Sequence, residues 1–372
     1  MPKSETAVLV LQGGGALGAY QAGAFQCLAE AGFDIGWVAG ISIGAINAAI
    51  ICGNPPDRRT ERLQEFWEEV SSVLAFTPPV WGPKSRHMFT EFAAAEVMAA
   101  GVPGFFKPQL PMAFWPFGES QALSVYDTSP LQKTLGELVD FDYLNDKGPR
   151  LSVGATDIET GNFAYFDSRK IRIDARHIMA SGALPPGFPP VEIDGHLYWD
   201  GGLVSNTPLQ YVMDNAGRDP LCIFQIDLFS ARGDRPSDIQ DVQQRDKDIR
   251  YSSRTRLTTD RYRHLHNLRA AAERLAAKLP KDMQSDPDLA VLREAGPDCP
   301  MTLVHLIHRK EGFEGNSKDY EFSRLSMTEH WAAGNADVKR TLSHKQWLSR
   351  QPGRDGLQVF DLSSKDEKGN KP

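Results

Sequence analysis

Residues 35–50 read IGWVAGISIGAINAAI and contain a G-x-S-x-G pentapeptide, Gly40-Ile41-Ser42-Ile43-Gly44. The apolar residues 35–39 predict a short buried strand, and residues 45–50 predict the first turns of a buried helix. A serine at a sharp turn between a strand and a helix lies at the tip of the turn, beside the free N–H groups of the helix N-terminus. The motif fits a catalytic serine and fits a small-residue loop before a helix about equally well, so both interpretations stay open.

A strand, a glycine loop and a helix precede this motif. Residues 8–11 read VLVL, residues 13–18 read GGGALG, and residues 19–31 predict a helix that ends at Gly32. In a parallel sheet both loops would lie at the carboxyl edge of the strands, where α/β proteins place their sites. We therefore expect the glycine loop and Ser42 at the same edge of the sheet.

The glycine loop has two interpretations. Gly13-x-Gly15-x-x-Gly18 matches the dinucleotide-binding fingerprint, but the next strand leads into the serine motif and lacks the carboxylate that holds a ribose. Binding of NAD or FAD is therefore the weakest hypothesis. The N–H groups of Gly13, Gly14 and Gly15 would instead form an anion-binding nest, which beside a nucleophilic serine would act as an oxyanion hole.

A serine nucleophile needs a base, and Asp200 is the outstanding carboxylate of the sequence. It ends a hairpin predicted over residues 191–199 and precedes two glycines that permit a tight turn. The neighbouring Tyr198 and Trp199 would desolvate Asp200 in part, which raises the pKa of a carboxylate toward the working pH of an enzyme. Five histidines leave a Ser-Asp-His triad open, namely His196, His264, His266, His305 and His308. The last two would point to opposite faces of a strand, which counts against a shared metal site.

The composition describes a globular protein. The chain has 372 residues, 41% of them hydrophobic, and a formal net charge of −7, which argues against nucleic-acid binding. Its four cysteines lack C-x-x-C spacing, so they predict neither a zinc site nor a disulfide framework. No run reaches the roughly 20 apolar residues of a membrane-spanning helix, and residues 7–11 are too short for the apolar core of a signal peptide. We therefore expect a cytoplasmic protein, soluble or peripherally bound to a membrane.

Two further segments bear on function. Residues 78–118 hold several prolines and many aromatic residues with little regular period, which predicts either a lid or binding loop or an irregular insertion that buries its aromatic side chains. Residues 243–278 predict a helical segment with ten basic and four acidic residues, a net charge of +6. We expect its apolar stripe to pack on the protein and its basic face to lie in water, with contact to anionic lipid as the alternative. The stripe consists of Leu265, Leu268, Ala272, Leu275 and Leu279.

Taken together, four blocks of the sequence resemble the patatin-like phospholipases, which are lipid acyl hydrolases with a Ser-Asp dyad. The blocks are GGGALG at 13–18, GISIG at 40–44, ASGALPPGF at 180–188 and DGG at 200–202. The resemblance implies an α/β fold, a three-layer α/β/α sandwich with a mostly parallel central sheet. It also implies that Ser42 is the nucleophile, that Asp200 is its base without a histidine, and that Gly13, Gly14 and Gly15 supply the oxyanion hole.

The sequence departs from the family pattern at Leu17, where many relatives carry a basic residue, so a preference for anionic phospholipid does not follow. Residues from about 230 on resemble an accessory region of some bacterial patatin-like proteins. We expect a catalytic domain over residues 1–229, with the insertion or lid at about 78–118, and a charged, mainly helical accessory region over residues 230–372.

Three functional hypotheses follow. The first is a serine acyl hydrolase of phospholipase A type that cleaves lipid or other fatty-acyl esters through an acyl-enzyme on Ser42, without a cofactor or metal. The second is a non-catalytic protein of lipid surfaces or granules, which the aromatic insertion and the basic helix would suit. The third is the NAD- or FAD-binding oxidoreductase. The expected partner is a lipid or fatty-acyl ester, with a membrane or lipid granule as a further contact and no nucleic acid.

Overall fold

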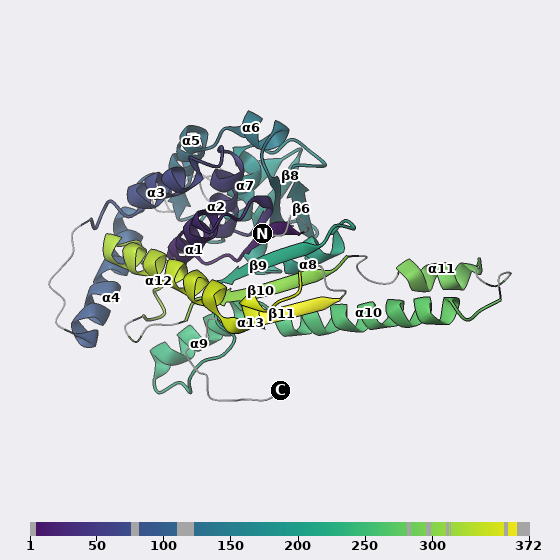
Figure 1. Cartoon of the computed structure of the whole chain (residues 1–372). Helices are drawn as coiled ribbons and strands as arrows, with labels where there is room; N and C mark the ends of the chain where they lie inside the picture. The colour runs from purple at the N-terminus through teal and green to yellow at the C-terminus, as the bar shows by residue number, and fades with distance from the viewer. Residues whose placement is uncertain are drawn as a thin grey trace.

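A mostly parallel β-sheet forms the centre of the computed structural model, which describes residues 5–75, 82–109, 123–280, 283, 285–294, 299–309, 312, 314–352 and 356–362 (Figure 1). The strands that pair in parallel are β1 (Thr6–Leu11), β2 (Ile35–Gly40), β5 (Arg150–Asp157), β9 (Leu221–Asp227), β10 (Met301–Ile307) and β11 (Leu357–Asp361). Antiparallel pairing adds β6 (Phe163–Asp167), β7 (Val191–Ile193) and β8 (His196–Asp200). The strand order is β11-β10-β9-β1-β2-β5-β8-β7, with β6 beside β5, and a separate ribbon pairs β3 (Lys107–Pro108) with β4 (Tyr126–Asp127).

Helices connect these strands along the chain. They are α1 (Gly18–Glu30), α2 (Ile43–Cys52), α3 (Arg59–Val70), α4 (Pro83–Ala100), α5 (Ser129–Leu138), α6 (Phe141–Asp146), α7 (Ala175–Ser181), α8 (Leu209–Asp214), α9 (Ile239–Tyr251), α10 (Thr255–Ala276), α11 (Pro287–Glu294), α12 (Arg324–Ser343) and α13 (Lys345–Leu348). The predicted βα units of the first fifty residues are therefore present as β1-α1 and β2-α2.

Alternate residues of β1 show why helices cover both faces of the sheet. Ala7, Leu9 and Leu11 enter one hydrophobic core with residues of α1, α2, α3 and α12. Val8 and Val10 enter a second core with residues of α8 and α10. Because successive side chains of a strand point to opposite faces, a continuous apolar run requires a hydrophobic layer on each side. This arrangement confirms the predicted three-layer α/β/α architecture with a mostly parallel sheet.

The segment that was expected to be irregular contains the regular helix α4, so that expectation was wrong for residues 83–100. Gly82, with φ 112°, and Pro83 at the first helical turn begin the helix, and Gly101, with φ 81°, ends it. Phe105 and Phe106 behind it are buried, whereas Phe92 on the helix is 56% exposed, so the described aromatics fit each of the two alternatives in part. Residues 76–81 and 110–122, which hold other aromatics of the proposed lid, lie outside the described residues.

The C-terminal part of the chain continues the same sheet. β10 pairs with β9, β11 pairs with β10, and α12 packs along α1 (Figure 1). The expected boundary at residue 229 therefore falls between two adjacent strands of one sheet.

The basic segment forms two helices, α9 and α10. The predicted apolar stripe was wrong for Leu268 and Leu275, whereas Ala272 is buried as expected. The buried residues of α10 are Thr255, Thr259, Tyr262, Ala272 and Ala276. Leu268 and Leu275 are instead 43% and 58% exposed. α10 extends beyond the end of the sheet, with α11 beside its far end (Figure 1).

Two expectations from composition can be compared with the structure. All four cysteines are buried, and none of them is in a disulfide. Among the helices of the described residues, none combines the length and the apolar character needed to cross a bilayer.

Candidate active site

Ser42 occupies a strained turn between β2 and α2. Its φ of 54° and ψ of −124° are rare for a residue with a side chain, and such strain is typical of a nucleophile elbow. The flanking glycines are required by close packing, because a Cβ on Gly40 would lie 2.3 Å from the carbonyl oxygen of Gly44, and one on Gly44 would lie 2.4 Å from that of Leu11. The turn therefore needs the G-x-S-x-G spacing that the sequence shows.

The backbone of Ser42 is fixed by Ser181, at the end of α7. The N–H of Ser42 donates to Ser181 Oγ over 3.0 Å, and Ser181 Oγ donates to the carbonyl oxygen of Gly154 on β5 over 2.6 Å. Ser181 is fully buried. Sequence reasoning quoted this serine within the block at 180–188 and gave it no role, because only the fold brings it to the turn.

Asp200 lies at the end of β8, within hydrogen-bonding reach of the Ser42 hydroxyl. Its Oδ1 accepts a 2.6 Å hydrogen bond from the N–H of Gly202, and its own N–H donates to the carbonyl oxygen of Ala183 over 3.0 Å. Burial raises the pKa of the Asp200 carboxyl to about 6, against the opposing effect of the hydrogen bonds from Gly202 and Ser42. The structure thus brings together the two residues that the sequence singled out as nucleophile and base.

The histidines that kept a triad open lie elsewhere. His196 is more than half exposed and lies 3.4 Å from Asp157, and His264 is exposed. His308 contacts Glu314. His305 is buried, which lowers its pKa, and the nearby Asp227 carboxylate offsets this effect in part. In the part of the chain that the structure describes, no histidine lines the cavity that holds Ser42 and Asp200.

The glycine loop lies directly against Ser42, since a Cβ on Gly13 would be 3.1 Å from the Ser42 Cβ. The N–H of Gly13 donates to the carbonyl oxygen of Asn206 over 3.2 Å, and Asn206 Nδ2 donates back to the carbonyl oxygen of Gly13 over 3.0 Å. Gly13, Gly14 and Gly15 all line the cavity. Asn206 is a residue that sequence reasoning missed, because no local signal links it to a loop nearly two hundred residues earlier.

The structure offers little room for a dinucleotide at this loop. A Cβ on Gly15, whose φ is 54°, would lie 1.9 Å from the carbonyl oxygen of Asp319. That oxygen also accepts the N–H of Ala16 over 2.8 Å. The space that a fingerprint glycine leaves for a pyrophosphate is therefore occupied by the protein's own backbone.

A cavity of about 360 Å³ opens beside Ser42 and Asp200. Most of its wall is apolar and aromatic, with rings from segments far apart in the chain. The Phe106 ring lies 5.1 Å from that of Phe188 and 4.8 Å from that of Tyr126, and the Phe105 ring lies 5.9 Å from that of Phe322. Such a cavity suits an apolar ligand with its polar end at the serine.

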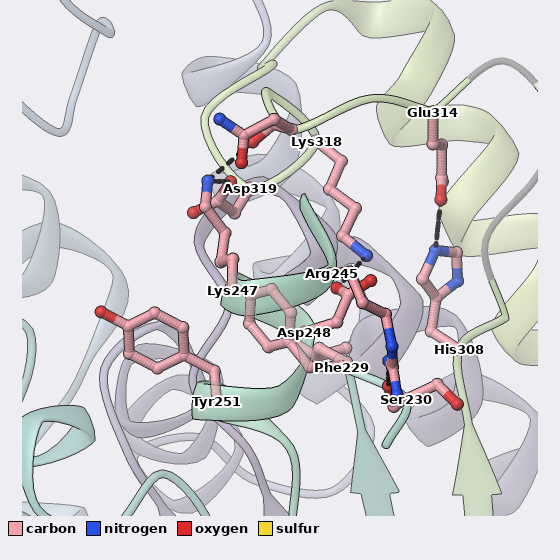
Figure 2. A network of polar contacts seen from close by, with 12 residues as sticks. Phe229, Ser230, Arg245, Lys247, Asp248, Tyr251, His308, Glu314, Lys318 and Asp319 are labelled. Atoms are coloured by element: carbon pink, nitrogen blue, oxygen red, sulfur yellow. Dashed lines mark hydrogen bonds and ion pairs between the residues drawn. The ribbon is translucent and has the colours of Figure 1, made fainter. Parts of the chain in front are cut away.

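The C-terminal part of the chain supplies one wall of this cavity, through Tyr251, Asp319, Tyr320 and Phe322. Two ion pairs hold the loop that carries three of them. Lys318 Nζ lies 2.7 Å from Asp248, and Lys247 Nζ lies 2.8 Å from Asp319. Figure 2 shows these pairs between the loop and α9, with Tyr251 at the end of that helix. Sequence analysis placed none of these residues at the site.

Two family models match this sequence. The model described as "Patatin-like phospholipase" matches residues 9–213, and one described as "Patatin phospholipase" matches residues 249–354. The patatin-like phospholipase domain-containing protein ZK370.4 of Caenorhabditis elegans is 27% identical over 223 residues, which cover 60% of this chain and only 13% of that protein.

Two solved structures are similar over 90% of this chain. VipD from Legionella pneumophila has 15% identity, a TM-score of 0.37 and 67% of its chain covered. Human GIVD cytosolic phospholipase A2 has 13% identity, a TM-score of 0.39 and 60% of its chain covered. Since the match over residues 9–213 spans more than half of the sequence, the chain belongs to the patatin-like phospholipase family.

Proposed function

We propose that this protein hydrolyses carboxylic esters of lipids, as a phospholipase A or lipid esterase, through an acyl-enzyme on Ser42. Family membership supports a lipid hydrolase activity. The observation that carries the proposal is the contact between the Ser42 hydroxyl and the buried carboxylate of Asp200 at the wall of an apolar cavity. The cavity would hold the acyl chain and leave the ester carbonyl at the serine.

In the first half of the reaction, Asp200 takes the proton of the Ser42 hydroxyl while Oγ attacks the carbonyl carbon. The resulting oxyanion accepts hydrogen bonds from the glycine loop. Because the Gly13 N–H already donates to Asn206, we assign this role mainly to the N–H groups of Gly14 and Gly15, with Gly13 shaping the loop. The tetrahedral intermediate collapses as the protonated Asp200 gives its proton to the leaving alcohol oxygen, which leaves an acyl ester on Ser42.

In the second half, Asp200 takes a proton from a water molecule, which attacks the acyl carbonyl. Collapse of this intermediate returns the proton to Ser42 Oγ and releases the fatty acid. Asp200 suits both steps because its pKa, raised by burial to about 6, makes it a stronger base than an exposed carboxylate and leaves it mostly ionised at neutral pH. No histidine is required in this scheme.

Fatty acid release from phosphatidylcholine vesicles tests the proposal. The wild-type protein should release fatty acid and lysophospholipid, and Ser42→Ala and Asp200→Asn should reduce release to the level of buffer. Ser72→Ala, which changes an exposed serine, is the matched control and should leave the rate unchanged. Unchanged release by folded Ser42→Ala would contradict the assignment.

We also infer that α10 contacts anionic lipid. Leu257, Leu268 and Leu275 are 70%, 43% and 58% exposed. Leu257 and Leu268 are 11 residues apart, and Leu268 and Leu275 are 7 residues apart. Both spacings are close to whole numbers of helical turns, so the three leucines lie on one face of the helix. The helix also carries five arginines against two acidic residues. An exposed apolar face flanked by arginine is suited to the interface of an anionic bilayer.

Flotation with vesicles tests this contact. Ser42→Ala protein should float with vesicles that contain phosphatidylglycerol and less with pure phosphatidylcholine, and Leu257→Ser with Leu275→Ser should reduce flotation. Arg261→Gln is a control for loss of a single charge and should have a smaller effect. Equal flotation of the double variant and the parent would contradict the assignment of α10.

A further inference from the structure

Three buried side chains outside the cavity form a cluster of metal-binding groups, His308, Glu314 and His330. They are 3%, 4% and 4% exposed. His308 directly follows β10, Glu314 lies in the loop before the cavity wall, and His330 lies on α12. Figure 2 shows Glu314 pointing from its loop toward the His308 ring at the end of β10. None of the three lines the cavity of Ser42, so the proposed hydrolysis does not use them.

The distances within the cluster are close to those of a coordination sphere. His308 Nε2 lies 3.1 Å from Glu314 Oε1 and 3.2 Å from Oε2, and His330 Nε2 lies 2.8 Å from Oε1. The ligating atoms of the three residues all lie within 4.8 Å of one another. Around tetrahedral zinc, with bonds of about 2.0 to 2.2 Å, neighbouring ligand atoms are about 3.3 Å apart. Small movements of these side chains would therefore admit an ion.

The ligand set indicates which ion would bind. Two imidazole nitrogens and a carboxylate suit zinc and other first-row divalent ions, whereas magnesium and calcium prefer oxygen ligands alone. The cluster offers three ligating residues, and a carboxylate such as that of Glu314 can bind an ion through one oxygen or both. We propose that His308, Glu314 and His330 bind a divalent cation of the zinc class. All three side chains are buried and none of them lines the cavity of Ser42, so we assign the ion a role in holding the fold and not in the hydrolysis.

The site would fix the cavity wall. Glu314 begins the segment 314–323, whose Asp319, Tyr320 and Phe322 line the cavity. The ion pairs of Lys318 and Lys247 attach this segment to α9, and the cation would attach it to β10 and α12 as well. The expectation that the chain has no metal site rested on the spacing of the cysteines and on the pair His305 and His308. The structure joins His308 instead to two residues that share no motif with it.

Metal content and binding of zinc chloride test this proposal without any ester substrate, so its outcome is independent of the proposed hydrolysis. The full-length protein should carry about one zinc per chain by plasma mass spectrometry, or take up one equivalent after chelation. Zinc should raise the melting temperature of the chelated protein, and equal concentrations of calcium chloride should not. Less than a tenth of an equivalent of zinc after titration, with no change in melting temperature, would overturn the proposal.

Variants locate the ion. Glu314→Gln keeps the shape of the side chain but removes the charged ligand. Loss of a residue that only hydrogen-bonds to a metal ligand weakens metal binding by roughly 10- to 100-fold, so loss of the ligand itself should weaken zinc binding by more than that. His264→Gln changes an exposed histidine and should bind zinc as the wild type does. Equal zinc binding by folded Glu314→Gln and wild type would place the ion elsewhere and overturn the assignment. If Glu314→Gln does not fold, the titration of the chelated wild type still decides whether one zinc binds.

Discussion

Burial and hydrogen bonding act in opposite directions on the Asp200 carboxylate, and burial dominates, with a resulting pKa of about 6. The base must be ionised to accept the serine proton. For a neutral ester such as p-nitrophenyl butyrate, kcat/KM should therefore be constant above this pKa and fall about tenfold per pH unit below it. The rate of ester hydrolysis is measured from pH 4.5 to pH 8, and the background rate of the Ser42→Ala variant is subtracted at each pH. A plateau that extends to pH 5 would contradict the role of Asp200.

The same pKa predicts that Asp200 destabilises the fold. An unfolded aspartate has a pKa of about 3.9, so the raised folded value means that stability is lost as pH rises from about 4 to about 6. This difference between the folded and unfolded pKa lowers the free energy of unfolding by about 3 kcal/mol above pH 6. Asp200→Asn should therefore be inactive yet unfold at a higher temperature than wild type at pH 7, with little difference at pH 4. Asp57→Asn, at an exposed position, is the control. A less stable Asp200→Asn at pH 7 would contradict this account.

Ser181 is predicted to position Ser42. Ser181→Ala would remove the acceptor of the partly buried Ser42 N–H and the hydroxyl that donates to the buried carbonyl oxygen of Gly154. Leaving such a group unsatisfied costs about 1 to 3 kcal/mol. We expect a lower free energy of unfolding and a lower kcat with little change in KM, measured by urea unfolding and ester hydrolysis. Ser72→Ala should change neither. A Ser181→Ala variant with wild-type kcat would show that the hydrogen bond does not support the turn.

At the scale of elements, two ion pairs attach the cavity-wall segment to α9, and they differ in burial. The side chains of Lys318 and Asp248 are 3% and 13% exposed, whereas those of Lys247 and Asp319 are 19% and 24% exposed. Removing one partner of a buried pair leaves the other charge buried and unpaired, which lowers the free energy of unfolding by about 3 to 5 kcal/mol. A more exposed pair contributes about 1 kcal/mol or less to that free energy.

Lys318→Ala should therefore lower the free energy of unfolding several times more than Lys247→Ala does. It should also raise KM for long-chain esters more than for short ones, because the displaced segment forms the cavity wall. Urea unfolding and a series of p-nitrophenyl esters measure both effects. Equal destabilisation by the two variants would show that burial does not distinguish the pairs.

Local patterns explain why some elements could be predicted and others could not. The G-x-S-x-G turn and the β7–β8 hairpin depend on neighbouring residues, so the sequence displays them. In α4, aromatic residues and prolines outside the helix obscured its period, although Gly82, Pro83 and Gly101 mark its ends. In α10, the buried residues are those that face α8 and β11, and they are not the most hydrophobic residues of the helix. Leu268 and Leu275 were therefore wrongly expected to be buried.

At the scale of the whole molecule, one sheet and one cavity combine both halves of the sequence. Ser42 follows β2 and Asp200 ends β8, each in a short motif, so the sequence alone could single out both as candidates. Asn206, Tyr251 and Asp319 could not be singled out in this way, because they reach the site only through the packing of the turn after β8, of α9 and of the segment after β10. The change in composition near residue 230 indicates where the charged helices begin. It gives no sign that C-terminal residues line the cavity, because only tertiary packing brings them there.

We propose that Ser42 is the nucleophile and that Asp200 activates it without a histidine. Labelling with a fluorophosphonate, followed by peptide mass spectrometry, measures both roles in one experiment. The wild-type protein should carry one adduct, on the peptide that contains Ser42, and Asp200→Asn should label far more slowly. Labelling by His196→Gln should match wild type. An adduct of equal yield in Ser42→Ala, or wild-type labelling rates in Asp200→Asn, would contradict the claim.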